Sequence, residues 1–362
     1  MKKTFLIFIS IYCLILFIVS LSFQIILKIN NLKLSSSAAK LSFPPTSLPA
    51  FDLPKLTLDS IFSLDHSWLN KLPSDQTITL ITTGDVIPAR TVNYKMTIYN
   101  DFTHPFLKTA DFLKAADLTL INLESPLIKN CPVLNAGMVF CGNQHFVDGL
   151  IFAGIDVANL ANNHTLNWGI EGMEQTINLL KENQVESCGF PTNQLAIKEL
   201  KGIKIGFLGW NFLESFDEED EILETIKQAR KQVDLLIVSA HWGTEYVDLP
   251  AEWQVNLAHK MIEAGADLIA GNHPHWFQPI EIYKDKLIIY AHGNFIFDQE
   301  WSQETKIGVV AKHTFYKNKL VDSQFFPIFL SDYNQPAFLQ AEEKQAVLSQ
   351  LQTVSDKVYG VK

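Results

Sequence analysis

The sequence predicts an α/β protein with mixed sheets. From Gln76 onward, strand-like runs alternate with helix-like segments, and many of these runs are continuously apolar. Continuously apolar strands are typical of largely parallel sheets that are buried on both faces. Residues 279–330 instead contain strand pairs typical of hairpins, which add antiparallel strands. The expected domain therefore contains both strand directions, with helices covering the sheets.

Each element follows from its own residues. Short runs rich in Ile, Leu, Val and Thr predict strands at 77–83, 117–123, 155–161, 204–210, 234–240 and 266–271. Segments with apolar residues at helical spacing predict helices at 104–116, 143–154, 172–183, 219–232, 252–265 and 341–358. In sheets of this kind, binding sites lie beyond the carboxyl ends of the parallel strands.

The N-terminal segment predicts a membrane anchor. Residues 5–27 contain no charged residue, and a helix of that length crosses a hydrocarbon core of about 30 Å. A cleaved signal peptide is the alternative, with a cleavage site at residues 37–39. Lysines on both sides of the run give little information on orientation. The short N-terminus favours a single-pass protein of the cell membrane whose main domain is extracytoplasmic.

The remaining chain divides by composition. Residues 35–75 are rich in Ser and Pro and predict a linker. Residues 76–330 form the expected domain, and residues 331–362 a tail with an amphipathic helix. The net charge of −10 argues against binding of nucleic acid, which requires a basic face. It does not exclude an anionic substrate, because a pocket can differ in charge from the whole protein.

Two cysteines lie close together in one predicted loop. Cys131 and Cys141 are ten residues apart, and an outward-facing domain would expose them to oxidising conditions. The spacing suggests a disulfide, and two free thiols remain the alternative.

Potential metal ligands follow nearly every predicted strand. Asp85, Glu124, the Asn163-His164 pair, His241, and His273 with His275 all stand at strand ends. Carboxylate, amide and imidazole ligands without thiolates suit Mn²⁺, Zn²⁺, Fe or Mg²⁺. Each residue alone has an ordinary structural explanation, such as a turn or a helix cap. Their joint occurrence predicts a site for one or two divalent ions.

The same segments resemble a known family. The motifs GDVIPAR, NLESPL, ANNHTLNWG, HWGTEY, GNHPH and HGNFIFD occur in the order found in CapA-type capsule or poly-γ-glutamate biosynthesis proteins. These are similar to calcineurin-like metallophosphatases, so the resemblance implies a four-layer α/β/β/α sandwich over residues 77–330. By position it implies a bridging Glu124 and a proton-donating His164. The metal ligands that it implies are Asp85, Glu124, Asn163, His241, His273 and His275.

The sequence departs from the pattern at two informative positions. Metallophosphatases usually carry a histidine two residues after the first aspartate, where this chain has Ile87. One ion would thereby lose a ligand. Relatives usually carry Asp where Asn167 stands, so this residue supplies no charge to orient His164.

Arg90 is one of only two arginines in the chain, and it lies within a motif. An arginine among many lysines suggests a bidentate contact with a substrate phosphate or carboxylate, and hence a catalytic role. The alternative is a structural salt bridge to Glu124 or Asp85.

The resemblance implies a part in capsule or poly-γ-glutamate synthesis and export, beside other polymer-synthesis subunits. It leaves open whether the protein is an enzyme. A metal-dependent hydrolase would act on γ-glutamyl amide bonds of the anionic polymer. The alternatives are a phosphoesterase acting on a cell-envelope phosphate ester, and a non-catalytic polymer-binding scaffold.

Overall fold

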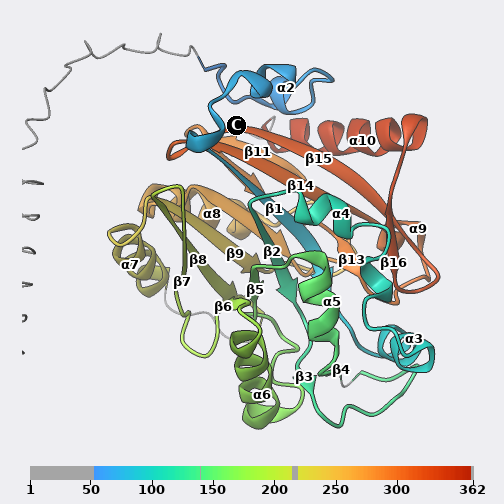
Figure 1. Cartoon of the computed structure of the whole chain (residues 1–362). Coiled ribbons are helices and arrows are strands. Elements are labelled where there is room, and N and C mark those ends of the chain that lie inside the picture. The colour runs from blue at the N-terminus through green and yellow to red at the C-terminus, as the bar shows by residue number, and fades with distance from the viewer. Residues whose placement is uncertain (1–52, 139, 214–218, 360–362) are drawn as a thin grey trace, which may run out of the picture. The chain divides into compact units, whose positions relative to one another are not determined.

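The computed structural model describes residues 53–138, 140–213 and 219–359 (Figure 1). In this part of the chain, two large sheets contain almost all of the strands. The first has the order β16-β15-β14-β1-β2-β5-β6, with β13 paired to β1, and the second has the order β11-β12-β10-β9-β8-β7. The strands of the first sheet are β1 (Thr77–Val86), β2 (Leu118–Leu123), β5 (Val157–Asn159), β6 (Glu186–Cys188), β13 (Asn294–Ile296), β14 (Ile307–Tyr316), β15 (Lys319–Ser331) and β16 (Gln335–Phe338). Those of the second are β7 (Ala196–Leu200), β8 (Ile203–Asn211), β9 (Leu235–His241), β10 (Leu268–Asn272), β11 (Ile280–Tyr283) and β12 (Lys286–Ile289).

Both sheets combine parallel and antiparallel pairs. In the first sheet β1, β2, β5 and β6 run parallel, whereas β14, β15 and β16 add antiparallel neighbours. In the second sheet β8, β9, β10 and β12 run parallel, with β7 and β11 antiparallel at the two edges. The predicted α/β class with mixed sheets is confirmed.

Three hydrophobic clusters show how the layers stack. One cluster lies between the sheets and joins Leu80 and Leu120 of the first sheet to Phe207 and Ile237 of the second. The helices form the two outer layers. The first sheet is covered by α3 (Thr91–Tyr99), α4 (Ala110–Lys114), α5 (Phe146–Ala153) and α6 (Gly169–Glu182), and the second by α7 (Glu219–Arg230) and α8 (Glu252–Ala264). The order of layers is therefore helices, sheet, sheet, helices.

The segments that precede and follow the sheet-forming residues in the sequence also contribute to this core. Leu56, and Ile61 of α2 (Leu58–Ile61), are buried in the same hydrophobic cluster, although the sequence assigns these residues to a linker. Figure 1 shows α10 (Ala341–Tyr359) lying across β11 and β15, and its Leu351 is fully buried in the same cluster. The remaining short elements are α9 (Gln303–Lys306), the 3₁₀ turns η1 (Ser67–Lys71), η2 (Ser74–Gln76) and η3 (His104–Phe106), and the ribbon β3 (Leu127–Ile128) with β4 (Gly142–Asn143).

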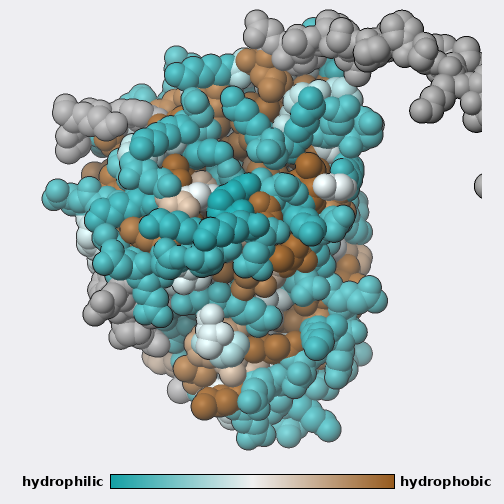
Figure 2. Space-filling model, turned by 90° about the vertical axis from the view of Figure 1, so that its left-hand side faces the viewer, coloured by the Kyte–Doolittle hydropathy of each residue, from teal (hydrophilic) through white to brown (hydrophobic). Residues whose placement is uncertain are grey.

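The predicted membrane anchor, residues 1–34, lies outside the described residues. Among the residues that are described, no helix is long and apolar enough to cross a membrane. Figure 2 shows one face of the molecule, on which hydrophilic residues predominate and hydrophobic ones lie in small separate groups. Such scattered hydrophobic residues are ordinary on protein surfaces.

Gly84 allows β1 to approach the chain that follows β12. The amide of Asp85 donates to the carbonyl of Gly293 over 3.0 Å. A Cβ atom at position 84 would lie 2.0 Å from that same carbonyl oxygen. Glycine is therefore required here because backbone, which cannot move aside, occupies the space of a side chain.

We expect Gly84→Ala to lower the free energy of unfolding by about 3 kcal/mol, because overpacking against backbone forces the strands apart. Urea denaturation would measure the change. Gly206→Ala is the matched control in another strand, since its Cβ would meet only side-chain ends at 3.0–3.2 Å. Equal losses in the two variants would contradict this account of Gly84.

Candidate metal centre

The predicted ligands come together because both sheets direct parallel strands toward the same place. Asp85 ends β1, Glu124 follows β2, and His241 ends β9. Each of these three side chains is fully buried. The residues that follow β10, His273 and His275, are also buried and complete the group. The carboxyl ends of strands from two sheets therefore form one polar cluster.

Glu124 is shared by two groups of three potential ligands. In the first group, ligand atoms of Glu124, His241 and His273 all lie within 4.8 Å of one another. In the second, the same holds for Asp85, Glu124 and His275. A carboxylate with two oxygens in this position can bridge two cations. This is the arrangement that the family resemblance implies.

Unsatisfied atoms in the first group fit a cation. Glu124 Oε1 and His273 Nδ1 are buried and have no hydrogen-bond partner. Beside them, His241 Nε2 lies 3.6 Å from Glu124 Oε1 and 2.9 Å from Asn163 Oδ1. Buried polar atoms without partners are rare, because each loses its hydration without compensation. Carboxylate, amide and imidazole donors converging on one point fit Mn²⁺, Zn²⁺ or Fe.

A cation would also neutralise the charges of the two buried carboxylates. Burial raises the pKa of Glu124 well above its usual value, and the charge of Asp85 adds to the effect. Burial also opposes the ionisation of Asp85, but a hydrogen bond and charge from His275 outweigh it and lower the pKa of Asp85. Two adjacent carboxylates therefore cannot both ionise readily unless a cation neutralises them.

The histidines are held in the form that binds metal. Burial lowers the pKa of His241 well below its usual value, and that of His273 to about 3. Neighbouring histidines add to both shifts. Neutral imidazole has a free lone pair, which protonated imidazole lacks. The site thus presents neutral nitrogen donors at ordinary pH.

The loop after β10 has an unusual backbone. His273 and His275 have φ angles of 99° and 58°, in the left-handed region that non-glycine residues seldom occupy. The His273 amide points toward Asp85 Oδ2 at 3.3 Å, and His275 Nδ1 lies 3.0 Å from the same oxygen. Strained backbone of this kind clusters at functional sites, where surrounding contacts maintain it.

His164 lies beside this cluster. Its Nε2 is 3.9 Å from Glu124 Oε1, and its Nδ1 is 2.9 Å from Asn167 Oδ1. The same Asn167 oxygen accepts a hydrogen bond from the Phe140 amide over 2.9 Å. The Asn167 atom that faces His164 is therefore the oxygen, and it can only accept. The His164 Nδ1 therefore carries a proton, and Nε2 faces the centre. The neutral amide of Asn167 thus orients His164 without adding a charge beside it.

Arg90 pairs with a carboxylate other than Glu124 or Asp85, the two salt-bridge partners that the sequence suggested. Its guanidinium forms a salt bridge with Asp298, whose other oxygen accepts the Thr91 amide over 3.0 Å. The predicted salt bridge to Glu124 or Asp85 is wrong. The guanidinium also lies over the rings of Phe140 and Phe297, 4.9 and 4.8 Å from their centroids. Arg90 is therefore built into the wall of the cluster, and its catalytic role stays a prediction.

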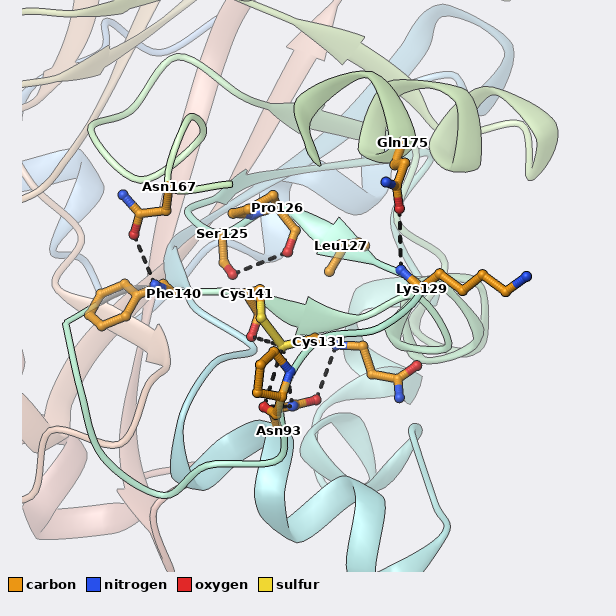
Figure 3. Close-up of a disulfide and its surroundings, with 12 residues drawn as sticks. Asn93, Ser125, Pro126, Leu127, Lys129, Cys131, Phe140, Cys141, Asn167 and Gln175 are labelled. Atoms are coloured by element: carbon orange, nitrogen blue, oxygen red, sulfur yellow. Dashed lines mark hydrogen bonds between the residues drawn. A yellow bond between two sulfur atoms is a disulfide. The ribbon is translucent and has the colours of Figure 1, made fainter. Parts of the chain in front are cut away.

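A disulfide fixes the loop that carries Phe140 (Figure 3). Cys131 and Cys141 are bonded, with their Cα atoms 5.8 Å apart, so the predicted pair is confirmed. The Phe140 ring lies 4.1 Å from that of His164. Figure 3 also shows the Phe140 amide bonded to Asn167. The cross-linked loop thereby holds His164 from one side.

Sequence reasoning missed Asn122, which lies at the middle of the cluster. Its Nδ2 donates to Asp85 Oδ1 over 2.8 Å, and its Oδ1 accepts from Asn159 and Asn162 over 3.1 and 3.2 Å. The available signal was strand alternation, because residues two apart point to the same side. Asn122 precedes Glu124 by two positions and so faces the site with it.

Comparisons with known proteins agree with the motifs. Residues 79–299 match a family described as bacterial capsule synthesis protein. The capsule biosynthesis protein CapA of Bacillus anthracis is 28% identical over 305 residues, covering 76% of this chain and 73% of that protein. The PGA biosynthesis protein CapA of Bacillus subtilis is 30% identical over 264 residues, covering 67% and 69%.

Two solved structures are similar to this chain at low sequence identity. A hypothetical protein of Thermus thermophilus is 15% identical, with a TM-score of 0.48, covering 69% of this chain and 98% of that one. The NAD nucleotidase of Haemophilus influenzae is 10% identical, with a TM-score of 0.42, covering 76% and 62%. Scores this low do not bear on the function of this chain.

We expect the double substitution Cys131→Ser and Cys141→Ser to lower the free energy of unfolding by about 2–3 kcal/mol, because the unfolded chain regains loop entropy. Thermal unfolding with and without reductant would measure it. Reductant should destabilise the wild type and leave the double variant unaffected. A reductant effect of equal size in both would show that the cross-link does not stabilise the domain.

Proposed function

The chain belongs to the bacterial capsule synthesis protein family, and from this premise we propose that it acts in making or exporting an anionic capsule polymer such as poly-γ-glutamate. It would do so through a divalent-metal centre of the hydrolase type. One observation carries the proposal: Glu124 is common to two buried ligand groups, and its Oε1 accepts no hydrogen bond within the described structure. Both relatives with Bacillus names are described as capsule or PGA biosynthesis proteins.

The two cation positions differ in the ligands that this chain offers. The first would be held by Glu124, Asn163, His241 and His273, and the second by Asp85, Glu124 and His275. At the position where the metallophosphatase pattern has a further histidine, Ile87 is fully buried against Phe140 and Phe297. The second cation is therefore expected to bind more weakly than the first.

The protein residues around the centre would each have a defined task. A divalent cation polarises a carbonyl or phosphoryl oxygen when it is bound. Burial lowers the pKa of His164, so its resting ring is neutral and carries its one proton on Nδ1, held by Asn167. His164 would first take up a solvent proton at Nε2, then pass that proton to the departing atom and return to the neutral ring. Arg90 is paired with Asp298 and would act by positioning the wall beside His164 and, through its remaining nitrogens, a substrate carboxylate.

The location of the domain is part of the proposal. Residues 1–34 would anchor the protein in the cell membrane, and residues 35–75 would connect the anchor to the domain at 76–330, followed by the tail at 331–362. The Cys131–Cys141 disulfide supports an extracytoplasmic domain, because such bonds persist in oxidising compartments. In that position the domain would meet the polymer and the other synthesis subunits.

A second candidate is a metallophosphatase-like phosphoesterase acting on a cell-envelope phosphate ester. The shared carboxylate favours it, because two cations bridged in this way clamp the oxygens of a phosphoryl group during displacement. A non-catalytic polymer-binding scaffold is the third. Incubating the purified full-length protein and Mn²⁺ with poly-γ-glutamate and, separately, with bis-p-nitrophenyl phosphate distinguishes them. Shortened polymer supports the first, nitrophenol release alone the second, and neither reaction the scaffold.

We expect the wild-type protein to bind Mn²⁺ and Glu124→Gln to lose this binding, because the amide removes the shared charge. Mn²⁺ at one hundred times its Kd should stabilise the wild type by about 2.7 kcal/mol. In EDTA, Glu124→Gln should be at least as stable as the wild type. The raised pKa of Glu124 means that its ionised form destabilises the metal-free protein as pH rises, and glutamine avoids that charge.

Metal content by mass spectrometry and thermal unfolding would give these results. Glu281→Gln is the matched control, since Glu281 is also buried but pairs with His259 in another part of the fold. If the wild type and Glu124→Gln bind the metal equally well, Glu124 is not a metal ligand and the proposed shared carboxylate is wrong.

We expect His164→Gln to slow cleavage of poly-γ-glutamate by a factor of about 10²–10⁴, because an amine must be protonated as it leaves. Release of nitrophenol, which departs without a proton, should change much less. His145→Gln is the control, because His145 is exposed and its ring lies beside Asp148 and Phe102 rather than the ligand cluster. Equal effects of His164→Gln on both substrates would show that His164 is not the proton donor.

A further inference from the structure

Four polar side chains form a hydrogen-bond chain in the apolar core between the two sheets. His292 Nδ1 lies 2.9 Å from the carbonyl oxygen of Gly271, and its Nε2 lies 2.8 Å from Thr82 Oγ1. Thr82 Oγ1 is also 3.0 Å from His313 Nε2. His313 Nδ1 is in turn 2.8 Å from Ser323 Oγ. All four side chains are buried, and none is among the metal ligands that the family resemblance implies.

The chain can run in only one direction. A carbonyl oxygen only accepts, so His292 Nδ1 must carry the proton. Burial lowers the pKa of His292 to about 4 and that of His313 to about 3, so each ring is neutral and carries one N–H. His292 Nε2 then accepts a hydrogen bond from the Thr82 hydroxyl. The Thr82 oxygen in turn accepts a hydrogen bond from His313 Nε2–H. The remaining His313 nitrogen accepts the hydroxyl of Ser323.

This chain connects the two sheets directly below the ligand cluster. Thr82 lies in β1, three residues before Asp85, whereas Gly271 lies in β10, two residues before His273. The His292 amide also donates to the Gly271 carbonyl over 3.1 Å, and the adjacent Gly293 carbonyl accepts the Asp85 amide. The link between His292 and Thr82 thus joins the strand that ends in Asp85 and Val86 to the strand that leads into His273 and His275.

We propose that His292 is a positioning residue for the metal centre, acting through the link Gly271–His292–Thr82 that fixes the end of β10 against the end of β1. The consequence for metal binding rests on the proposed function, whereas the hydrogen-bond chain itself does not. Hydrogen bonds suit this task because apolar packing allows strands to slide, while a bonded hydroxyl and imidazole specify one register. Ligand orientation is commonly fixed by such supporting contacts.

Thr82→Val tests the link with almost no change in side-chain shape. It removes the hydroxyl that joins the two rings, and we expect the Kd for Mn²⁺ in the full-length protein to rise at least tenfold. Thr82→Ser keeps the hydroxyl and should leave the Kd within about twofold of the wild type. An unchanged Kd in Thr82→Val would overturn the positioning role.

Ser323→Ala separates positioning from general stability. It removes the last hydroxyl of the chain but leaves the link between β1 and β10 intact. We expect it to lower the melting temperature of the metal-free protein without changing the Kd for Mn²⁺. If the Kd instead follows the melting temperature across all three variants, the chain is merely structural and the proposal fails.

The protonation of the two rings gives a test that needs no metal. Fifteen-nitrogen NMR shifts, assigned with His292→Gln and His313→Gln, should show Nδ1–H on His292 and Nε2–H on His313. The opposite tautomer on either ring would show that the hydrogen-bond chain does not run as described. A wild-type protein that binds no Mn²⁺ would refute the proposed centre and the positioning role together, while the tautomers would still decide whether the chain exists.

Discussion

The structure around the strand ends depends on the burial of two neighbouring carboxylates, Asp85 and Glu124. A buried charge is costly unless it is paired. Among the described residues, their ion-pair partners are histidines alone: His275 for Asp85, and His164 and His241 for Glu124. Burial holds the pKa of His241 low, so it supplies little positive charge. The cost of burying the two carboxylates would be smaller if a bound divalent cation supplied the positive charge that the histidines do not.

Neutral amides organise this group without altering its charge. Asn122 bonds Asp85 on one side and Asn159 and Asn162 on the other, while Asn162 donates to the Leu123 carbonyl over 2.9 Å. An amide donates and accepts at once, so a row of them can fix geometry across several strands. A lysine in the place of Asn122 would neutralise a carboxylate permanently and compete with a cation. The neutral side chain of Asn122 thus suits a site that would keep its shape with and without an ion.

Local sequence predicted the parts of the site that stand at the ends of elements. Asp85 and His241 each terminate an apolar strand, and parallel strands place such residues at one edge. What it missed depends on contacts between distant segments. Asp298 is 208 residues from Arg90, and no local pattern pairs them. Asn122 lies within a strand, where only the fold reveals that Asp85 of the neighbouring strand faces it.

Helices were predictable where one face is clearly apolar, as in residues 252–264, and less so elsewhere. The expected helix over 104–116 is divided into η3 and α4. Proline at position 105 suits the first turn of a helix, and the chain turns again before Ala110. Helix α3 was not expected at all, because its β-branched and aromatic residues are as typical of strands. Tertiary packing of Val92 and Met96 decides its conformation.

The asymmetry of the proposed centre follows from packing at Ile87. Ile87, Ala89, Phe140 and Phe297 form a small buried hydrophobic cluster, and the two aromatic rings contact Arg90 as well. Phe140 also packs on His164, and Phe297 lies 5.3 Å from His275. A histidine at position 87 would place an imidazole within this cluster, where a polar nitrogen has no partner except an ion. In the proposed centre, the apolar contacts around His164 and Arg90 would therefore leave the second cation with one ligand fewer. One enclosed cation position would thus be combined with an apolar wall beside His164, at the expense of the second position.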